Sequence, residues 1–395
     1  MATDDDPSLQ GLIEEKLEEI ADELDDDEDV DEVVSDLFDD LVEANYEGLM
    51  DHRDTMLEDW REEMNGFEDR LYDDWQEPID LFESFIVFSL ELGQMYSRDR
   101  QEAAMDDEDL VHLVLVKLHA RACLIAREIL ALIKQGYADG AHARWRSIHE
   151  VAVVGEFLRQ TGQETAKRFM LHQAIDDYHQ AVAYRNEQDT LRGEPISDET
   201  MEELEQRREK LLDHYGSGFD GTWGWASHEI ERGRFKDIEE HAGYGQFYPY
   251  YKFASKANIH SGAKGTFEQL ATSDRYRLST PTAPANLGFT LPATHAARSL
   301  FQITMALLLH RPNEEYMVQL LTAREFLEDI EHAFPEVRAT IEQRDEEMWD
   351  EYLDEYLSDI EDNLDEFVEE MDDFTPPIVE IDLEDFEVHV GGKDS

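Results

Sequence analysis

The chain has 395 residues, of which 96 are acidic and 34 are basic, so its formal net charge at pH 7 is −62. Apolar residues make up 41% of the chain, which suffices for a sizeable core and excludes a wholly disordered protein. The single cysteine, Cys123, excludes an internal disulfide framework, and its apolar neighbours predict an inert buried thiol. The sequence has no signal-peptide pattern and no stretch of about 20 uncharged apolar residues. We therefore expect a cytoplasmic protein without a membrane span.

The charge is concentrated at the two ends of the chain. Residues 1–80 carry a net charge of −29 and residues 325–395 carry −25, whereas residues 81–324 carry only −8. At about 1 M salt the Debye length falls to about 3 Å, which screens the self-repulsion of such acidic arms. With 24 arginines and 10 lysines, the composition is typical of a salt-loving prokaryote of archaeal type.

We interpret the acidic arms as a solvated coat, with an acidic tail that binds a basic partner as the alternative. Direct nucleic-acid binding by the arms is disfavoured, because phosphates need cations. The partner is unknown from sequence, and a homodimer is compatible with it.

Apolar residues at helical spacing predict amphipathic helices in both arms. In residues 1–80 three apolar stripes recur before Pro78, which predicts a boundary. In the second arm, residues 337–371 predict one long amphipathic helix. Residues 378–390 alternate loosely, which indicates either an edge strand or a disordered tail.

The central region predicts a bundle of helices. It opens with the most apolar helix of the chain, residues 110–134, which Gly136 closes at a C′ position. Asp139 is predicted to cap the next helix. Residues 272–292 contain three prolines without periodicity, and a loop of this length is either disordered or a functional lid. The later helices are expected over residues 140–160, 164–191, 197–213 (capped by Ser197), 235–241, 247–260, 293–310 and 313–333, with Pro312 and Pro335 between segments.

These patterns predict an all-α protein. Its helical central bundle carries acidic amphipathic helical extensions at both ends, together with at most a short C-terminal β strand. The predicted domains are an N-terminal arm (1–80), a central all-α domain (81–324), an acidic C-terminal helix (325–374) and a tail (375–395).

Two patterns resemble known sites but are interpreted as structural. Residues 216–221 spell GxGxxG, but a charged helix precedes them, and a dinucleotide loop needs a preceding strand, so we expect a turn. His172, Asp176 and His179 share one face of the helix predicted over residues 164–191, where they could hold a divalent metal. Since acids are abundant and no HExxH motif supports these three, a solvated face is preferred, and we expect no cofactor.

Arg144 and His149 fit the R-x4–6-H pattern of HEPN ribonucleases. In that family the arginine steadies phosphate charge while the histidine transfers the proton. About three such matches are expected by chance in a chain of this composition, and four occur. The pattern alone is therefore no evidence for a ribonuclease.

Arg146 and Glu150 have a more informative setting. They stand at i and i+4 on a predicted helix whose other faces are apolar. A buried pair of this kind needs further partners to satisfy it. We weigh a structural ion pair against a ligand-facing pair, and the sequence leaves both open.

A second polar centre is expected near residue 251. On the predicted helix, Tyr251 and Ser255 share one face, as do Lys256 and His260. His260 is placed in the last helical turn, where the dipole favours its protonated form, and a structural cap is the alternative to a functional role. Trp225 is interpreted as a core or cleft-lining aromatic, since base stacking lacks the surrounding basic residues that it requires.

The central region resembles the family known as domain of unknown function 5677, over about residues 105–310. The resemblance implies an intracellular, helical protein of the kind found in bacteria and archaea, with no established activity. It also implies a shared polar site of unassigned role at Arg146, Glu150, Ser255 and His260. The matching elements, in order, are Arg146-Ser-Ile-His-Glu150, Trp225, Phe235 and the run from Tyr251 through Ser255 to His260-Ser-Gly262.

Two functions are carried forward, and whether the protein is an enzyme is left open. The first is a binding or regulatory module whose polar site combines Arg146 and Glu150 with Tyr251, Ser255 and His260. The second is a metal-independent ribonuclease of HEPN type, in which a histidine is the base and an arginine clamps phosphate. The candidates for those two roles are His149 or His260 and Arg144 or Arg146.

Overall fold

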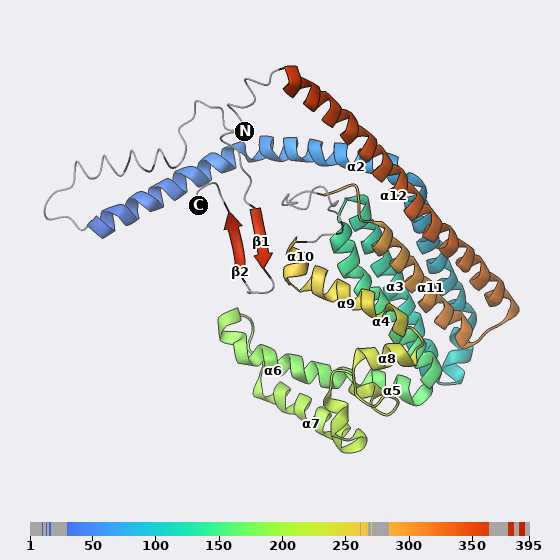
Figure 1. The fold of residues 1–395 in the computed structure, drawn as a ribbon. Helices are drawn as coiled ribbons and strands as arrows, with labels where there is room; N and C mark the ends of the chain where they lie inside the picture. Colours follow the sequence, from blue (N-terminus) through green and yellow to red (C-terminus); the bar gives the residue numbers. More distant parts are fainter. Residues whose placement is uncertain are drawn as a thin grey trace. The chain divides into compact units, whose positions relative to one another are not determined.

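The computed structural model describes residues 10, 13, 16, 30–260, 262–267, 270, 284–362, 378–382 and 387–391. These residues are mainly helical, apart from two short strands near the C-terminal end (Figure 1). The all-α prediction is thereby confirmed. The chain divides into two compact units, residues 1–70 and 71–395, which are described separately.

The first unit consists of the beginning of α2 (Val30–Asp106), a single helix that continues into the second unit. Several of its apolar side chains, including Phe38, Tyr46, Leu49 and Trp60, are exposed to solvent. The amphipathic helices predicted for the N-terminal arm are, over residues 30–70, part of one continuous helix.

The predicted boundary at Pro78 is wrong, because α2 runs through this proline. A proline inside a helix removes one backbone hydrogen bond and costs about 3 kcal/mol. Trp75, Ile79 and Phe82 beside it are fully buried, and the indole Nε1–H of Trp75 donates to Asn286 Oδ1 at 2.8 Å. Tertiary packing of these residues offsets the local cost.

The core of the second unit is built on three helices packed against one another, α3 (Leu110–Lys134), α4 (Ala138–Thr161) and α11 (Thr290–His310). Figure 1 shows them side by side, with α12 (Glu314–Asp362) against α11. The predicted bounds of α3 are confirmed, and Gly136 follows its end with φ of 83°. α12 is continuous through Pro335, which the sequence suggested would separate two helices.

The start of α4 differs from the prediction. Tyr137 precedes the helix and its side chain makes no capping hydrogen bond, so Asp139 is not the N-cap. Asp139 lies in the first turn, where its carboxylate accepts hydrogen bonds from Asn258 Nδ2 and from the backbone N–H of Leu270. It therefore joins α4 to a distant segment instead of capping its own helix.

The single helix predicted over residues 164–191 is two helices, α5 (Gln163–Leu171) and α6 (Gln173–Leu191), with His172 between them. α7 (Asp198–Tyr215) packs beside α6 (Figure 1), and Ser197 caps it by accepting from Thr200 N. The GxGxxG stretch that follows forms the short turn η1 (Ser217–Asp220), as predicted.

The chain between α7 and α11 is a series of short elements. Aromatic side chains from this stretch, including Phe219, Trp225, Phe235 and Phe247, pack against α4 in a second buried cluster. The elements are η2 (Gly224–Ala226), α8 (Phe235–His241), η3 (Gly245–Phe247), α9 (Tyr248–Phe253), the π-helical turn η4 (Ala254–Ile259) and α10 (Ala263–Phe267).

The loop expected over residues 272–292 ends earlier than predicted, since α11 begins at Thr290 and includes Pro292. Residues 272–283, on which the lid hypothesis depends, lie outside the described residues. At the C-terminal end, β1 (Ile378–Asp382) and β2 (Glu387–Gly391) pair antiparallel, with Ile381 opposite Val388. Among the described helices, none combines the length and apolar character that a bilayer span requires.

Candidate functional site

Three of the predicted site residues form one polar network between α4 and α9. Tyr251 lies at its centre: its hydroxyl donates to Glu150 Oε1 at 2.5 Å and accepts from Arg146 Nη2 at 2.5 Å. Arg146 Nη2 also pairs with Glu150 Oε1 at 2.9 Å. The side chains of Arg146 and Glu150 are 32% and 28% exposed, so this pair is half-buried instead of fully enclosed.

The network follows from helical spacing. Arg146 and Glu150 are one turn apart on α4, and the Tyr251 side chain reaches both, with the guanidinium carbon 4.6 Å from its ring centre. Burial raises the pKa of Tyr251, and its hydrogen bond to Glu150 raises it further. Tyr251 is therefore a neutral hydrogen-bonding group that fixes α9 on α4.

A buried pair lies beside this network. His149 Nε2–H donates to Glu239 Oε1 on α8 at 2.7 Å, and the two side chains are 1% and 0% exposed. The His149 ring also contacts Trp145 at 5.3 Å and Tyr251 at 6.0 Å between ring centres. Since both partners are enclosed, this pair holds α8 against α4 and is closed to solvent.

Two further histidines, His142 and His295, continue the row around Trp145. His142 Nδ1–H donates to Asn258 Oδ1 at 2.8 Å. Burial lowers the pKa of His142, and it lowers that of His295 to about 3. Both rings are therefore neutral parts of the core at pH 7.

The remaining polar candidates do not join the network. Ser255 Oγ donates to the Tyr251 carbonyl at 2.9 Å, a bond within its own helical turn. Lys256 and His260 are exposed, and the ring of His260 makes no hydrogen bond to another residue that the structure describes. His260 follows the π-helical turn in an extended conformation, so it is not in the last helical turn as predicted. Arg144 pairs with Glu128, away from His149.

A groove of about 680 Å³ lies beside the outer face of α3, and we call it the α3 groove. Two cations of α3, Lys117 and Arg121, line it at i and i+4. Trp223 also lines the groove, and its ring packs on Phe235 with 5.5 Å between ring centres. The full lining comprises Leu113, Val114, Lys117, Leu118, Arg121, Phe169, Met170, His172, Gln173, Asp176, Thr222, Trp223 and Trp225.

Three residues singled out by sequence, Trp225, His172 and Asp176, line this groove. His172 Nε2–H donates to the Gly221 carbonyl at 2.9 Å, while its Nδ1 is 3.6 Å from Asp176 Oδ2. His179 instead bonds Asp220 Oδ1 at 3.1 Å. In the described residues, no three His, Cys, Asp or Glu side chains are grouped so that they could hold a metal ion.

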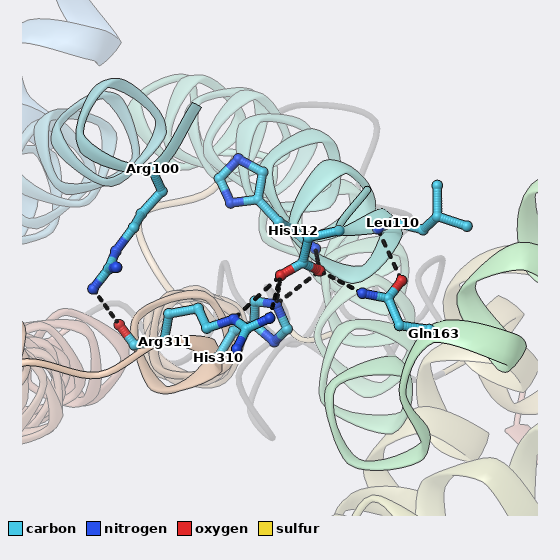
Figure 2. Close-up of polar contacts among 7 residues, drawn as sticks. Arg100, Leu110, His112, Gln163, His310 and Arg311 are labelled. Atoms are coloured by element: carbon cyan, nitrogen blue, oxygen red, sulfur yellow. Dashed lines mark hydrogen bonds and ion pairs between the residues drawn. The ribbon is translucent and has the colours of Figure 1, made fainter. Parts of the chain in front are cut away.

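A second polar cluster centres on Asp109, the N-cap of α3. Its carboxylate accepts from His112 N, from Gln163 Nε2 and from the side chains of His310 and Arg311 at 2.8 to 3.2 Å. Figure 2 shows how Gln163, at the start of α5, and the neighbouring His310 and Arg311, at the end of α11, converge. Desolvation opposes ionisation of Asp109, but these hydrogen bonds outweigh it and hold its pKa at about 2. The cluster joins α3, α5 and α11.

A second groove of about 520 Å³ adjoins Asp109, between the end of α2 and the start of α3. Its lining is mostly apolar and includes Met105, Leu110, Leu113 and Val116. The charged groups of the Asp109 cluster are already paired, so this groove offers fewer polar contacts than the α3 groove.

Comparison with known proteins finds one family match, in the central region. Residues 112–276 match a family of unknown function, DUF5677. No curated protein and no solved structure matches the chain.

The DUF5677 region contains both the Tyr251 network and the whole of the α3 groove. Asp109, His310 and Arg311 lie outside it, as does His295. The predicted resemblance is confirmed in this region.

Sequence reasoning missed three residues of the DUF5677 region that the structure makes prominent. Glu239 is on a short helix ninety residues from His149, and no spacing rule links them. No motif or spacing singles out Lys117 and Arg121, which line the α3 groove. One pattern could have found the cations: residues 110–127 contain no acid, in a chain with 96 of them.

Proposed function

We propose that this protein is a non-enzymatic binding module that holds a small anionic ligand in the α3 groove. The observation that carries this proposal is the presence of two cations without acidic partners in one groove of a strongly acidic protein. The match to DUF5677 adds no activity, since that is a family of unknown function.

Most arginines of the second unit are paired with carboxylates, as Arg146 is with Glu150 and Arg168 is with Glu229. Lys117 and Arg121 form no ion pair with any residue that the structure describes. Two neighbouring cations on one helix repel each other, and an anion between them removes this cost. Arginine and lysine are also the side chains that bind phosphate and carboxylate groups most strongly.

The size of the groove supports a small ligand. Small-molecule sites usually have volumes of about 300 to 1,000 Å³ and combine apolar walls with few polar groups. At about 680 Å³, with Phe169, Trp223 and Trp225 in its walls, the α3 groove fits this description.

The Tyr251 network supports a structural role. Arg146, Glu150 and Tyr251 satisfy one another, and none of them is an isolated nucleophile or base. Such a network positions helices, which is the first of the two interpretations left open by the sequence.

The ribonuclease alternative receives less support from the geometry. A general base must come within hydrogen-bond reach of the ribose hydroxyl, and His149 is 1% exposed and bonded to Glu239. His260 is exposed, but no hydrogen bond or ion pair links it to Arg144 or Arg146. We therefore expect purified protein to leave single-stranded RNA intact; cleavage that is lost in His260→Ala would favour the ribonuclease.

Binding is tested by calorimetric titration of the full chain with inorganic pyrophosphate, in a series of KCl concentrations. The wild-type protein should bind one pyrophosphate, more weakly as salt rises. Lys117→Gln/Arg121→Gln should weaken binding at least tenfold, since each charge-assisted hydrogen bond is worth about 1.5 to 3 kcal/mol. Lys210→Gln/Arg232→Gln removes the same charge from exposed positions outside the groove and should bind like wild type. Equal weakening by both double variants would show only a general charge effect and refute the site.

A further inference from the structure

We infer that the ligand of the α3 groove joins a planar ring to an anionic group, an inference that rests on the proposed function. The groove contains two kinds of wall, and each matches one part of such a molecule. Lys117 and Arg121 provide the cationic wall, and Trp223 with Phe169 provides the aromatic wall.

The aromatic wall is held in place before any ligand binds. Trp223 is partly exposed, and its ring packs on Phe235 and on Trp225, with the latter rings 6.2 Å apart at 64°. Trp225 in turn makes edge contacts with Phe169 at 5.1 Å and with Phe157 at 5.6 Å. A ring fixed in this way loses little freedom on binding, so stacking on it contributes more of its energy to affinity.

The cationic wall belongs to α3. Lys117 and Arg121 are one turn apart on the exposed face of α3, in a stretch of 18 residues, 110–127, without an acid. The guanidinium of an arginine binds phosphate or carboxylate through two parallel hydrogen bonds, and a lysine adds a point charge. Both groups suit one anionic substituent at the end of a ligand.

A third feature restricts the ligand further. Among the described residues that line the groove, Asp176 is the single acid, and its side chain is 58% exposed. Its neighbour His172 is held by the Gly221 carbonyl, so the Asp176 carboxylate keeps free acceptor positions. The Asp176 carboxylate in the groove repels a second anionic group of the ligand. It can also accept a hydrogen bond from a hydroxyl or amino group of the ligand.

The volume of the α3 groove is compatible with two classes of ligand that join a ring to an anion. These are a nucleoside monophosphate and a smaller aromatic acid. The experiment distinguishes them by calorimetry with four probes: AMP, indole-3-acetate, ribose 5-phosphate and adenosine. Ribose 5-phosphate has the anion without a ring, and adenosine has the ring without an anion. We expect AMP or indole-3-acetate to bind at least fivefold more tightly than either half-molecule, since stacking on one aromatic ring is worth roughly 5- to 160-fold.

Single substitutions test the contributions of Trp223 and of Asp176 to the affinity separately. Trp223→Leu should reduce the affinity for the ring-bearing probe at least fivefold while leaving that for ribose 5-phosphate unchanged, and Trp223→Phe should recover most of the loss. Asp176→Asn removes the negative charge and keeps one carbonyl acceptor, so it should tighten the binding of ribose 5-phosphate and of the ring-bearing probe. If Trp223→Leu does not fold, saturation-transfer NMR on the wild type replaces it, with the strongest transfer expected at ring protons.

The outcomes distinguish this inference from the proposal on which it rests. Pyrophosphate and ribose 5-phosphate binding that depends on Lys117 and Arg121, with no gain from a ring, overturns the planar-ring inference and leaves the binding module intact. Failure of every probe and of pyrophosphate overturns both. Tight binding of adenosine alone, insensitive to Lys117→Gln/Arg121→Gln, overturns both as well.

Discussion

Replacing Asp109 by asparagine should destabilise the protein, because this carboxylate is the shared acceptor of three helices. Its side chain is 4% exposed and accepts from His112 N, Gln163, His310 and Arg311. These contacts hold its pKa at about 2, against an ordinary value of 3.8. At 1.36 kcal/mol per pKa unit, the ionised form contributes about 2 kcal/mol to the free energy of unfolding at pH 7.

The direction of the pH dependence follows from the lowered pKa of Asp109. A carboxyl group with a depressed pKa in the folded state stabilises the protein above its unfolded pKa, and this contribution is lost as the pH falls from about 4 to about 2. Asp109→Asn keeps the shape and an N-capping oxygen but removes the charge. We therefore expect a loss of about 2 to 3 kcal/mol at pH 7, and a much smaller difference from wild type at pH 2.

The assay is urea unfolding of the full chain, followed by circular dichroism at 222 nm, at fixed molar KCl. Asp177→Asn, an exposed carboxylate on α6, is the matched control and should lie within about 0.5 kcal/mol of wild type. Arg311 donates to the same carboxylate. The double variant Arg311→Gln/Asp109→Asn should therefore lose less free energy of unfolding than the sum of the losses in the two single variants. An Asp109→Asn variant as stable as the Asp177→Asn control would refute the reasoning.

Three further predictions concern the second unit and the acidic coat. Tyr251→Phe removes the hydroxyl between Arg146 and Glu150 and should lower the free energy of unfolding by about 1 to 2 kcal/mol in the same urea assay, with an unchanged midpoint counting against the network. His149→Leu leaves the Glu239 carboxylate buried without its donor and should cost about 3 to 5 kcal/mol, measured as a lower thermal midpoint; a loss under 1 kcal/mol would contradict the buried pair. The unfolding midpoint in urea should rise as KCl increases from about 0.1 to 2 M, since salt screens a net charge of −62, and a flat dependence would exclude self-repulsion as a main effect.

Local rules predicted the apolar helices well because their information is contained in a few neighbouring residues. The bounds of α3 and α8, the Ser197 cap and the turn at residues 216–221 all follow from periodicity, capping and glycine placement. The prolines misled the prediction, because Pro78 and Pro335 both lie within long helices. In both helices, packing against distant elements outweighs the helix-breaking preference of proline. Sequence periodicity does not report which distant elements will pack there.

The part of the candidate site that depends on local spacing was predicted from the sequence. Arg146 and Glu150 meet by helical spacing, and Tyr251 was named as their partner. The placement of His260 was wrong, since a π-helical turn precedes it and shifts the register by which it was assigned to that face. Lys117 and Trp223 line one groove only because of the tertiary fold, so this groove could not be predicted from sequence spacing. How the chain divides into a central domain and two arms stays a proposal.

The central claim is that the α3 groove, and not the Tyr251 network, receives the ligand. A crystal structure of the full chain grown with AMP tests it most directly. The account predicts phosphate density beside Lys117 and Arg121 and base density against Trp223, with Arg146, Glu150 and Tyr251 still bonded to one another. Density for the phosphate on Arg146, with Tyr251 displaced and the α3 groove empty, would contradict it.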